Sequence, residues 1–244
     1  MKLLVFPHSH YCEKVRWVLD YKNIAYEPVA IMPGLHLWTV RRYGKQTSVP
    51  VLLDGDTAIQ GSSEIIDYLE EKFPDKSLTP TNREELDACM AIEKDMDIRL
   101  GVNIRQILYA KLLEYPDYIR FCFTNPMPAY KKCFFTMMYP VLKRKIYTAY
   151  VKSDEKVAKA QIEFDKALAD IEAIISKQPY LLGDTFSRAD VSVASLLSLL
   201  VLPDEHPFPW KEKEIPDADI KALQETYLKH PVGEWVAKIY REHR

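Results

Sequence analysis

The chain changes character near residue 75, and this change constrains the fold more than any other feature of the sequence. Before it, short apolar runs typical of β-strands alternate with segments whose apolar residues recur at helical spacing. The pattern predicts the order β-α-β-α-β-β-α, with elements over residues 2–6, 12–21, 26–31, 34–43, 51–53, 57–60 and 62–73. The turn signal Asp54-Gly55-Asp56 makes the last two strands a hairpin. We therefore predict a small α/β domain over residues 1–75.

The second part of the chain shows only helical patterns. A polar stretch with a proline near each end predicts a linker over residues 76–84. Beyond it, helical periodicity covers residues 84–114, 153–177, 188–202 and 217–230. Four prolines interrupt residues 116–140, which predicts either broken helices or a long loop. Strands first and helices later indicate two domains, the second an all-α domain over residues 85–244.

Composition excludes several classes of protein. Lys and Arg number 33 against 35 Asp and Glu, and this net charge of -2 argues against a nucleic-acid binder. The longest apolar stretch, residues 191–202, is shorter than the roughly 20 residues of a membrane span. The four cysteines form no CxxC pair, which argues against a metal ribbon or a disulfide framework and favours a reduced, cytoplasmic chain.

The turn after the first strand is the first candidate site. Exposed N–H groups and the positive end of the helix dipole favour an anion there. Ser9 is placed either to cap the helix or to donate a hydrogen bond to a ligand anion. Cys12 is either a small core residue or a reactive thiol whose pKa the helix lowers. His8, His10 and Cys12 also have a spacing that metal sites use, but no further ligand cluster accompanies them.

Two further segments of the first domain are candidates for ligand contact. The bond between Val49 and Pro50 joins a loop to a strand and is a candidate cis bond, which would present the Val49 main chain to a ligand. Ser62 and Ser63 begin the helix over residues 62–73. Serines at this position either cap the helix or bind a carboxylate together with the free N–H groups.

Ser187 and Asp190 have the spacing of a capping box, with Asp in place of the usual Glu. The box precedes the apolar run over residues 191–202, so this helix is expected to form the buried centre of the second domain. We assign the pair a structural role and not a catalytic one.

These motifs stand in the order and at the separations of one family, and the chain resembles the cytosolic glutathione transferases. A strand followed by Ser9 and then Lys14-Val15-Arg16 is similar to the N-terminal motif of the zeta and tau classes. Residues 49–52, Val-Pro-Val-Leu, resemble the family's cis-proline loop. Residues 61–69 and the capping box resemble its Glu-Ser-x-x-Ile-x-x-Tyr-Leu motif and its helix cap in the second domain.

The resemblance implies a thioredoxin-like domain that binds glutathione as co-substrate, without a metal. It implies that Ser9 is catalytic and stabilises the glutathione thiolate for attack on a small hydrophobic electrophile. The residues implied to bind glutathione are Ser9, Tyr11, Val49, Pro50, Ser62 and Ser63. Aromatic residues between the domains are candidates for the electrophile pocket, although any one of them is an ordinary core residue as readily: Tyr11, Tyr109, Tyr115 and Trp210. A cytoplasmic homodimer that acts in detoxification is also implied, with no nucleic-acid or membrane partner.

Two alternative functions remain open at this point. Omega-class members and glutaredoxins carry a cysteine at the position of Ser9, so Cys12 falls on the second cysteine of the glutaredoxin CxxC motif. A thiol-disulfide reductase that uses Cys12 is therefore the first alternative. Gly61 replaces the family's usual Glu, and Ser48 stands where many members have Lys or Gln. These departures leave a non-catalytic binding protein with the same fold as the second alternative.

Overall fold

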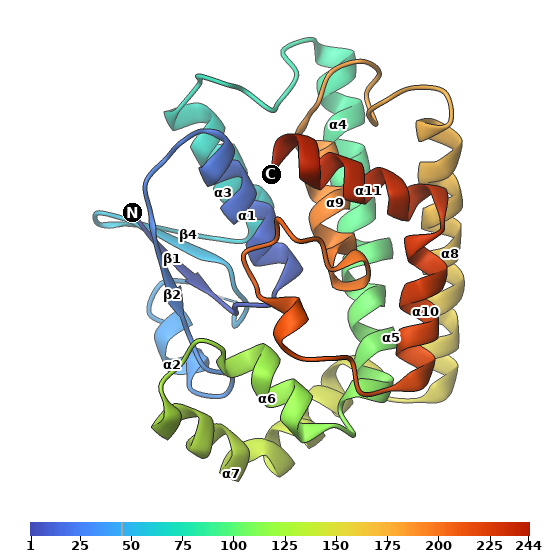
Figure 1. Ribbon diagram of the computed structural model, residues 1–244. Coiled ribbons are helices and arrows are strands. Elements are labelled where there is room, and N and C mark those ends of the chain that lie inside the picture. The colour runs from blue at the N-terminus through green and yellow to red at the C-terminus, as the bar shows by residue number, and fades with distance from the viewer. Residues whose placement is uncertain (45) are drawn as a thin grey trace.

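The computed structural model describes residues 1–44 and 46–244. Its N-terminal part is built on a mixed sheet with the strand order β2-β1-β3-β4 (Figure 1). The strands are β1 (Lys2–Val5), β2 (Glu27–Ala30), β3 (Val51–Asp54) and β4 (Thr57–Gln60). β1 pairs in parallel with β2 and antiparallel with β3, which forms the predicted hairpin with β4. Gly55, with φ of 59°, allows the tight reversal between β3 and β4.

Three helices cover this sheet and complete the predicted order β-α-β-α-β-β-α. They are α1 (His10–Tyr21), α2 (His36–Val40) and α3 (Ser62–Lys72). Successive side chains of a strand point to opposite faces of the sheet, so the side chains of β1 pack into two hydrophobic clusters. Leu3 and Val5 join the large core that includes α1 and α3, while Leu4 packs with Val40 of α2 in a smaller cluster on the other face. The apolar runs therefore place α1 behind the sheet with its first residues at the end of β1.

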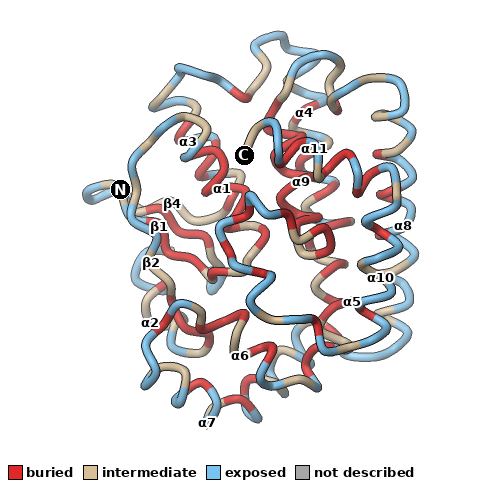
Figure 2. The backbone as a smooth tube through the Cα atoms, in the orientation of Figure 1, coloured by how far each residue is buried: buried red, intermediate tan, exposed pale blue. Residues whose placement is uncertain are grey.

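The rest of the chain is largely helical. Its α-helices are α4 (Arg83–Met96), α5 (Asn103–Leu112), α6 (Pro116–Thr124), α7 (Ala129–Ile146), α8 (Asp154–Ile175), α9 (Arg188–Val201), α10 (Ala218–Leu228) and α11 (Pro231–His243). Two π-helical segments, η1 (Asp97–Val102) and η2 (Tyr147–Val151), and a 3-10 turn, η3 (Trp210–Glu212), complete it. α9 is buried along nearly its whole length, as expected (Figure 2). The predicted capping box at its start is confirmed, since the Ser187 N–H donates to the Asp190 carboxylate at 2.8 Å.

Several details differ from the expectations. Of the two alternatives predicted for the proline-rich stretch, broken helices are confirmed, as α6 and α7, and the long loop is wrong. Pro116 opens α6 at a position where the missing N–H costs nothing, whereas Pro140 lies within α7. Gly61, and not a serine, is the N-cap of α3, and Ser62 is the first helical residue. The predicted helices stop at residue 230, so α11 was missed.

The two parts of the chain pack closely against each other. α1 packs on α9, and the large hydrophobic core runs without interruption from β1 to α11. The division into residues 1–75, 76–84 and 85–244 stays a prediction. None of the described helices is both long enough and apolar enough to pass through a bilayer.

Candidate active site

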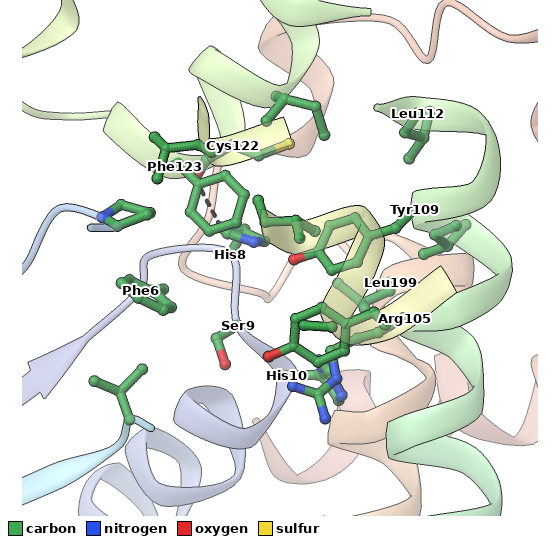
Figure 3. A pocket seen from close by; sticks show the side chains of 18 of the residues that line it. Phe6, His8, Ser9, His10, Arg105, Tyr109, Leu112, Cys122, Phe123 and Leu199 are labelled. Carbon is green, nitrogen blue, oxygen red and sulfur yellow. Dashed lines mark hydrogen bonds between the residues drawn. The ribbon is translucent and has the colours of Figure 1, made fainter. Parts of the chain in front are cut away.

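A cavity of about 410 Å³ lies between the sheet and the helices. Its walls come from the turn after β1, the loop before β3, helices α5, α6 and α7, and the segment before α10 (Figure 3). Five residues predicted from the sequence line it: Ser9, Tyr11, Val49, Tyr109 and Trp210. The fold thus brings together residues that lie up to about two hundred positions apart in the chain.

Ser9 is both a helix cap and a residue of the cavity wall. It precedes α1 with extended backbone (φ -75°, ψ 122°), and its Oγ accepts a hydrogen bond from the Cys12 N–H at 3.4 Å. In Figure 3 its side chain lies between those of His8 and His10, across the cavity from Tyr109. A hydroxyl that accepts from the backbone keeps its own proton as a donor. Capping and ligand binding are therefore compatible at this position.

Cys12 packs as a residue of the hydrophobic core. Its side chain is fully buried, and the residue is absent from the cavity wall. Burial raises the pKa of the Cys12 thiol, although Arg16 and the contact with Ser9 act in the opposite direction. The expectation that the helix terminus would lower this pKa is therefore wrong, because desolvation outweighs the favourable charges.

The loop before β3 forms the side of the cavity next to Ser9. The predicted cis bond between Val49 and Pro50 is confirmed, and Val49 lines the cavity while Pro50 is buried behind it. The Gln60 side chain holds this loop by donating to the carbonyl oxygens of Gln46 and Ser48, at 3.0 and 2.9 Å. The main chain at Val49 is therefore held in place by β4.

The two serines at the start of α3 have different surroundings. Ser62 is nearly buried and lies outside the cavity wall. Ser63 donates from its hydroxyl to Glu93 Oε1 at 2.7 Å and accepts from Lys14 Nζ at 3.4 Å. The Ser63 hydroxyl is thus engaged in a network of charges. Ser62 and Ser63 both remain predicted glutathione ligands.

The four aromatic residues predicted for the electrophile pocket do not all reach it. Tyr11, Tyr109 and Trp210 line the cavity, and the Tyr11 hydroxyl donates to the Asp97 carbonyl oxygen at 2.5 Å. Burial raises the pKa of Tyr11 far above its ordinary value, so the phenol stays protonated and adds an uncharged ring to the cavity wall. Tyr115 is outside the cavity, and its hydroxyl instead donates to Asp217 at 3.2 Å.

The histidines beside Ser9 are held by main-chain carbonyl groups. His8 Nδ1 donates to Cys122 O at 2.8 Å, and His10 Nε2 donates to Gly101 O at 2.9 Å. Burial lowers the pKa of both rings, that of His8 to about 4, so both are neutral at pH 7. In the described part of the chain, no group of three His, Cys, Asp or Glu side chains is arranged to hold a metal ion.

Arg105 is the main residue of the cavity wall that sequence reasoning missed. It lies on α5 together with Leu108, Tyr109 and Leu112, which all face the cavity. These positions have the spacing i, i+3, i+4 and i+7 of one helix face. A cation within such an otherwise apolar stripe was a usable signal, because an arginine seldom lies on the apolar face of a helix without a partner.

Comparison with known proteins places the chain in a family. Two family models match it: the glutathione S-transferase N-terminal domain over residues 3–77 and the C-terminal domain over residues 154–218. Glutathione S-transferase 1 from Dianthus caryophyllus is 36% identical over 235 residues, which cover 94% of this chain and 88% of the relative. The chain belongs to the glutathione S-transferase family.

Other matches of this glutathione S-transferase agree with that placement. Glutathione S-transferase Z1 from Arabidopsis thaliana is 35% identical over 83 residues, which span 33% of this chain and only 38% of the relative. A glutathione S-transferase from Ceriporiopsis subvermispora, solved in complex with glutathione, has a TM-score of 0.61 at 17% identity and covers 100% of this chain and 97% of that one. At this identity the structural likeness supports the fold alone.

Proposed function

We propose that this glutathione S-transferase uses Ser9 to stabilise the thiolate of glutathione, which then attacks a small hydrophobic electrophile in the cavity. The observation that carries the proposal is the contrast between two side chains of the same turn. Ser9 lines the cavity with a hydroxyl proton free to donate, whereas the Cys12 thiol is fully buried. This contrast argues against the thiol-disulfide reductase, which needs an accessible cysteine.

The first turn of α1 supplies the electrostatics of the proposed reaction. A thiolate beside Ser9 accepts the hydroxyl proton in a charge-assisted hydrogen bond, and the helix N-terminus adds positive potential. Both favour the charged form, so they lower the pKa of the bound thiol and release its proton to solvent. The sulfur then forms a bond to the electrophilic carbon. Val49 is proposed to pair with the glutathione main chain, and Ser62 with its γ-glutamyl carboxylate.

Replacing Ser9 with alanine is expected to reduce turnover by about 10- to 100-fold, because one hydrogen bond to a charged group is worth about 1.5–3 kcal/mol. The pKa of the bound glutathione thiol is expected to rise in the variant. The measurement is a titration of thiolate absorbance in the enzyme–glutathione complex, beside turnover with a chloronitrobenzene.

Two further variants separate catalysis from capping and from cysteine chemistry. Ser9→Gly removes the hydroxyl but costs only a few tenths of a kcal/mol as an N-cap, so it should lose turnover with little loss of stability. Cys12→Ala should retain the turnover of the wild type at a temperature where it is folded. An unchanged thiol pKa in both Ser9 variants would reduce Ser9 to a cap. Loss of activity in Cys12→Ala alone would restore the reductase hypothesis, and wild-type protein that binds glutathione without turnover would favour the non-catalytic one.

Family membership also supports a cytoplasmic homodimer, with each N-terminal domain against the helical domain of the partner. Light scattering is expected to give twice the 28.4 kDa mass of the chain. A single-chain mass at micromolar concentration would contradict the homodimer.

A further inference from the structure

We infer that the electrophile accepted by this cavity carries a carboxylate, and that Arg105 binds it. The inference rests on the proposed function and adds the class of its second substrate. The first observation is the charge of the cavity wall, where the described residues include two cations, Arg105 and Lys145, and neither aspartate nor glutamate. Most of the remaining wall is apolar or aromatic, as around Leu108 and Phe123. Such a cavity suits a flat apolar molecule with a negative end.

The second observation is the state of the Arg105 side chain. Its guanidinium carbon lies 5.2 Å from the centroid of the Tyr11 ring and 4.9 Å from that of the Tyr150 ring. Arg99 and Arg188, on neighbouring helical segments, pair with aspartates at 2.7 and 2.6 Å, but Arg105 forms no ion pair with any described residue. Its Nε is buried and has no hydrogen-bond partner among these residues.

This arrangement leaves a donor without its acceptor. Arg105 is partly buried, and its guanidinium stays charged. A charge that is partly withdrawn from water is stabilised when an opposite charge and hydrogen-bond acceptors reach it. The two rings contact the guanidinium, whose planar fork of donors suits a bidentate contact with a planar carboxylate. Trp210 also lines the cavity, and its buried Nε1 is a second donor without a partner among the described residues. A carboxylate offers acceptors for such donors.

The position of Arg105 connects the anion site to the reacting sulfur. In Figure 3 its side chain enters the space that Ser9 borders from the other wall. A molecule whose carboxylate meets Arg105 therefore extends its apolar part between α5 and the turn after β1. The electrophilic carbon of such a molecule lies within the same cavity as the glutathione thiolate.

The test compares two electrophiles of nearly the same shape but different charge, 4-chloro-3,5-dinitrobenzoate and 4-chloro-3,5-dinitrobenzamide. In both, the thiolate bonds to the carbon that carries chlorine and chloride leaves, so no oxidant or reductant is needed. The ratio of kcat/KM for acid over amide is measured in wild type and in Arg105→Gln, which cancels the intrinsic reactivity of each probe. We expect the variant to lower this ratio by about 10- to 100-fold, the size of a lost hydrogen-bonded ion contact.

Two variants serve as controls. Arg105→Lys keeps the charge but loses the planar fork, so it should keep part of the preference for the acid. Lys143→Gln removes the same charge from α7 at a side chain that pairs with Glu114 at 2.6 Å and lies outside the cavity wall. This control should leave the ratio within about twofold of wild type, because a screened surface charge has little effect.

The outcomes separate this inference from the proposed function. If Arg105→Gln lowers kcat/KM for acid and amide equally, Arg105 has a packing role and the inference fails. If the variant raises only the KM for glutathione, Arg105 binds glutathione and the inference fails as well. If wild type turns over neither probe, the proposed function is contradicted, and calorimetry with the unreactive 3,5-dinitrobenzoate and its amide decides the inference. Tighter binding of the acid that Arg105→Gln abolishes supports the anion site, and equal binding of both overturns it.

Discussion

Replacing Glu93 with glutamine is expected to lower the free energy of unfolding by about 3–5 kcal/mol, the usual cost of breaking a buried ion pair. Glu93 of α4 is buried and contacts Lys14 of α1 at 2.7 Å and Arg188 of α9 at 2.6 Å. Burial alone would raise the pKa of Glu93, but Lys14 and Arg188 outweigh it and lower this pKa to about 2. The neutral amide leaves the two buried cations with one negative charge fewer.

The matched control for Glu93→Gln is Glu163→Gln. Glu163 pairs with Lys166 at a similar 2.7 Å, but both side chains are about half exposed. An exposed pair contributes about 1 kcal/mol at most, so this variant should unfold close to wild type. Urea denaturation of the three proteins gives the comparison, and Glu93→Gln should also melt roughly 6–20 °C lower. Equal stability of the two variants would show that the Glu93 network adds no more than a surface pair.

This network also gives Ser63 partners that the sequence analysis did not predict. Ser63 was expected to bind glutathione because local sequence patterns place it at the start of α3. In the folded chain its hydroxyl meets Glu93 and Lys14, which come from α4 and α1. Only the packing of three helices determines that partner, and nothing in the residues around Ser63 indicates it.

Much of the fold was predictable because it depends on local patterns. The order of the first seven elements follows from apolar periodicity and from the turn at Gly55, and Ser9 is placed by the strand-to-helix transition alone. The far wall of the cavity was harder to predict. The predicted helical stretch over residues 84–114 did not single out α5. Pro140 suggested a break that α7 does not have, and Tyr115 turned toward α10 instead of the cavity. Each of these outcomes depends on contacts between segments distant in the sequence.

Acidification from pH 7 to pH 5 is expected to destabilise the protein, with His206 as a principal cause. His206 Nδ1 accepts from the Phe208 N–H at 2.9 Å, and the ring is nearly buried 3.7 Å from Glu13. Burial lowers the pKa of His206 to about 4, since it and the cations Arg16 and Arg244 outweigh the attraction of Glu13. His10, also buried, has its pKa lowered in the same direction.

The sign follows from proton binding in the two states. Below pH 6.5 the histidine of the unfolded chain takes up a proton, whereas His206 in the folded protein does not until about pH 4. Proton uptake therefore stabilises the unfolded state across this window. For His206, the free energy of unfolding falls by about 2 kcal/mol between pH 7 and pH 5. Most carboxylates titrate below this range, so the histidines dominate the change.

His206→Asn tests this assignment, because the Asn Oδ1 can accept from the Phe208 N–H in place of the ring nitrogen. The free energy of unfolding, measured by urea at pH 7, 6 and 5, should fall less steeply with acidification in this variant than in wild type. His230→Asn is the matched control, since His230 Nδ1 accepts from Val232 N at 3.2 Å in a more exposed place. This control should change the pH dependence of the free energy of unfolding less than His206→Asn does. If both variants keep the wild-type slope, the acid sensitivity has another origin, with His10 the next residue to replace.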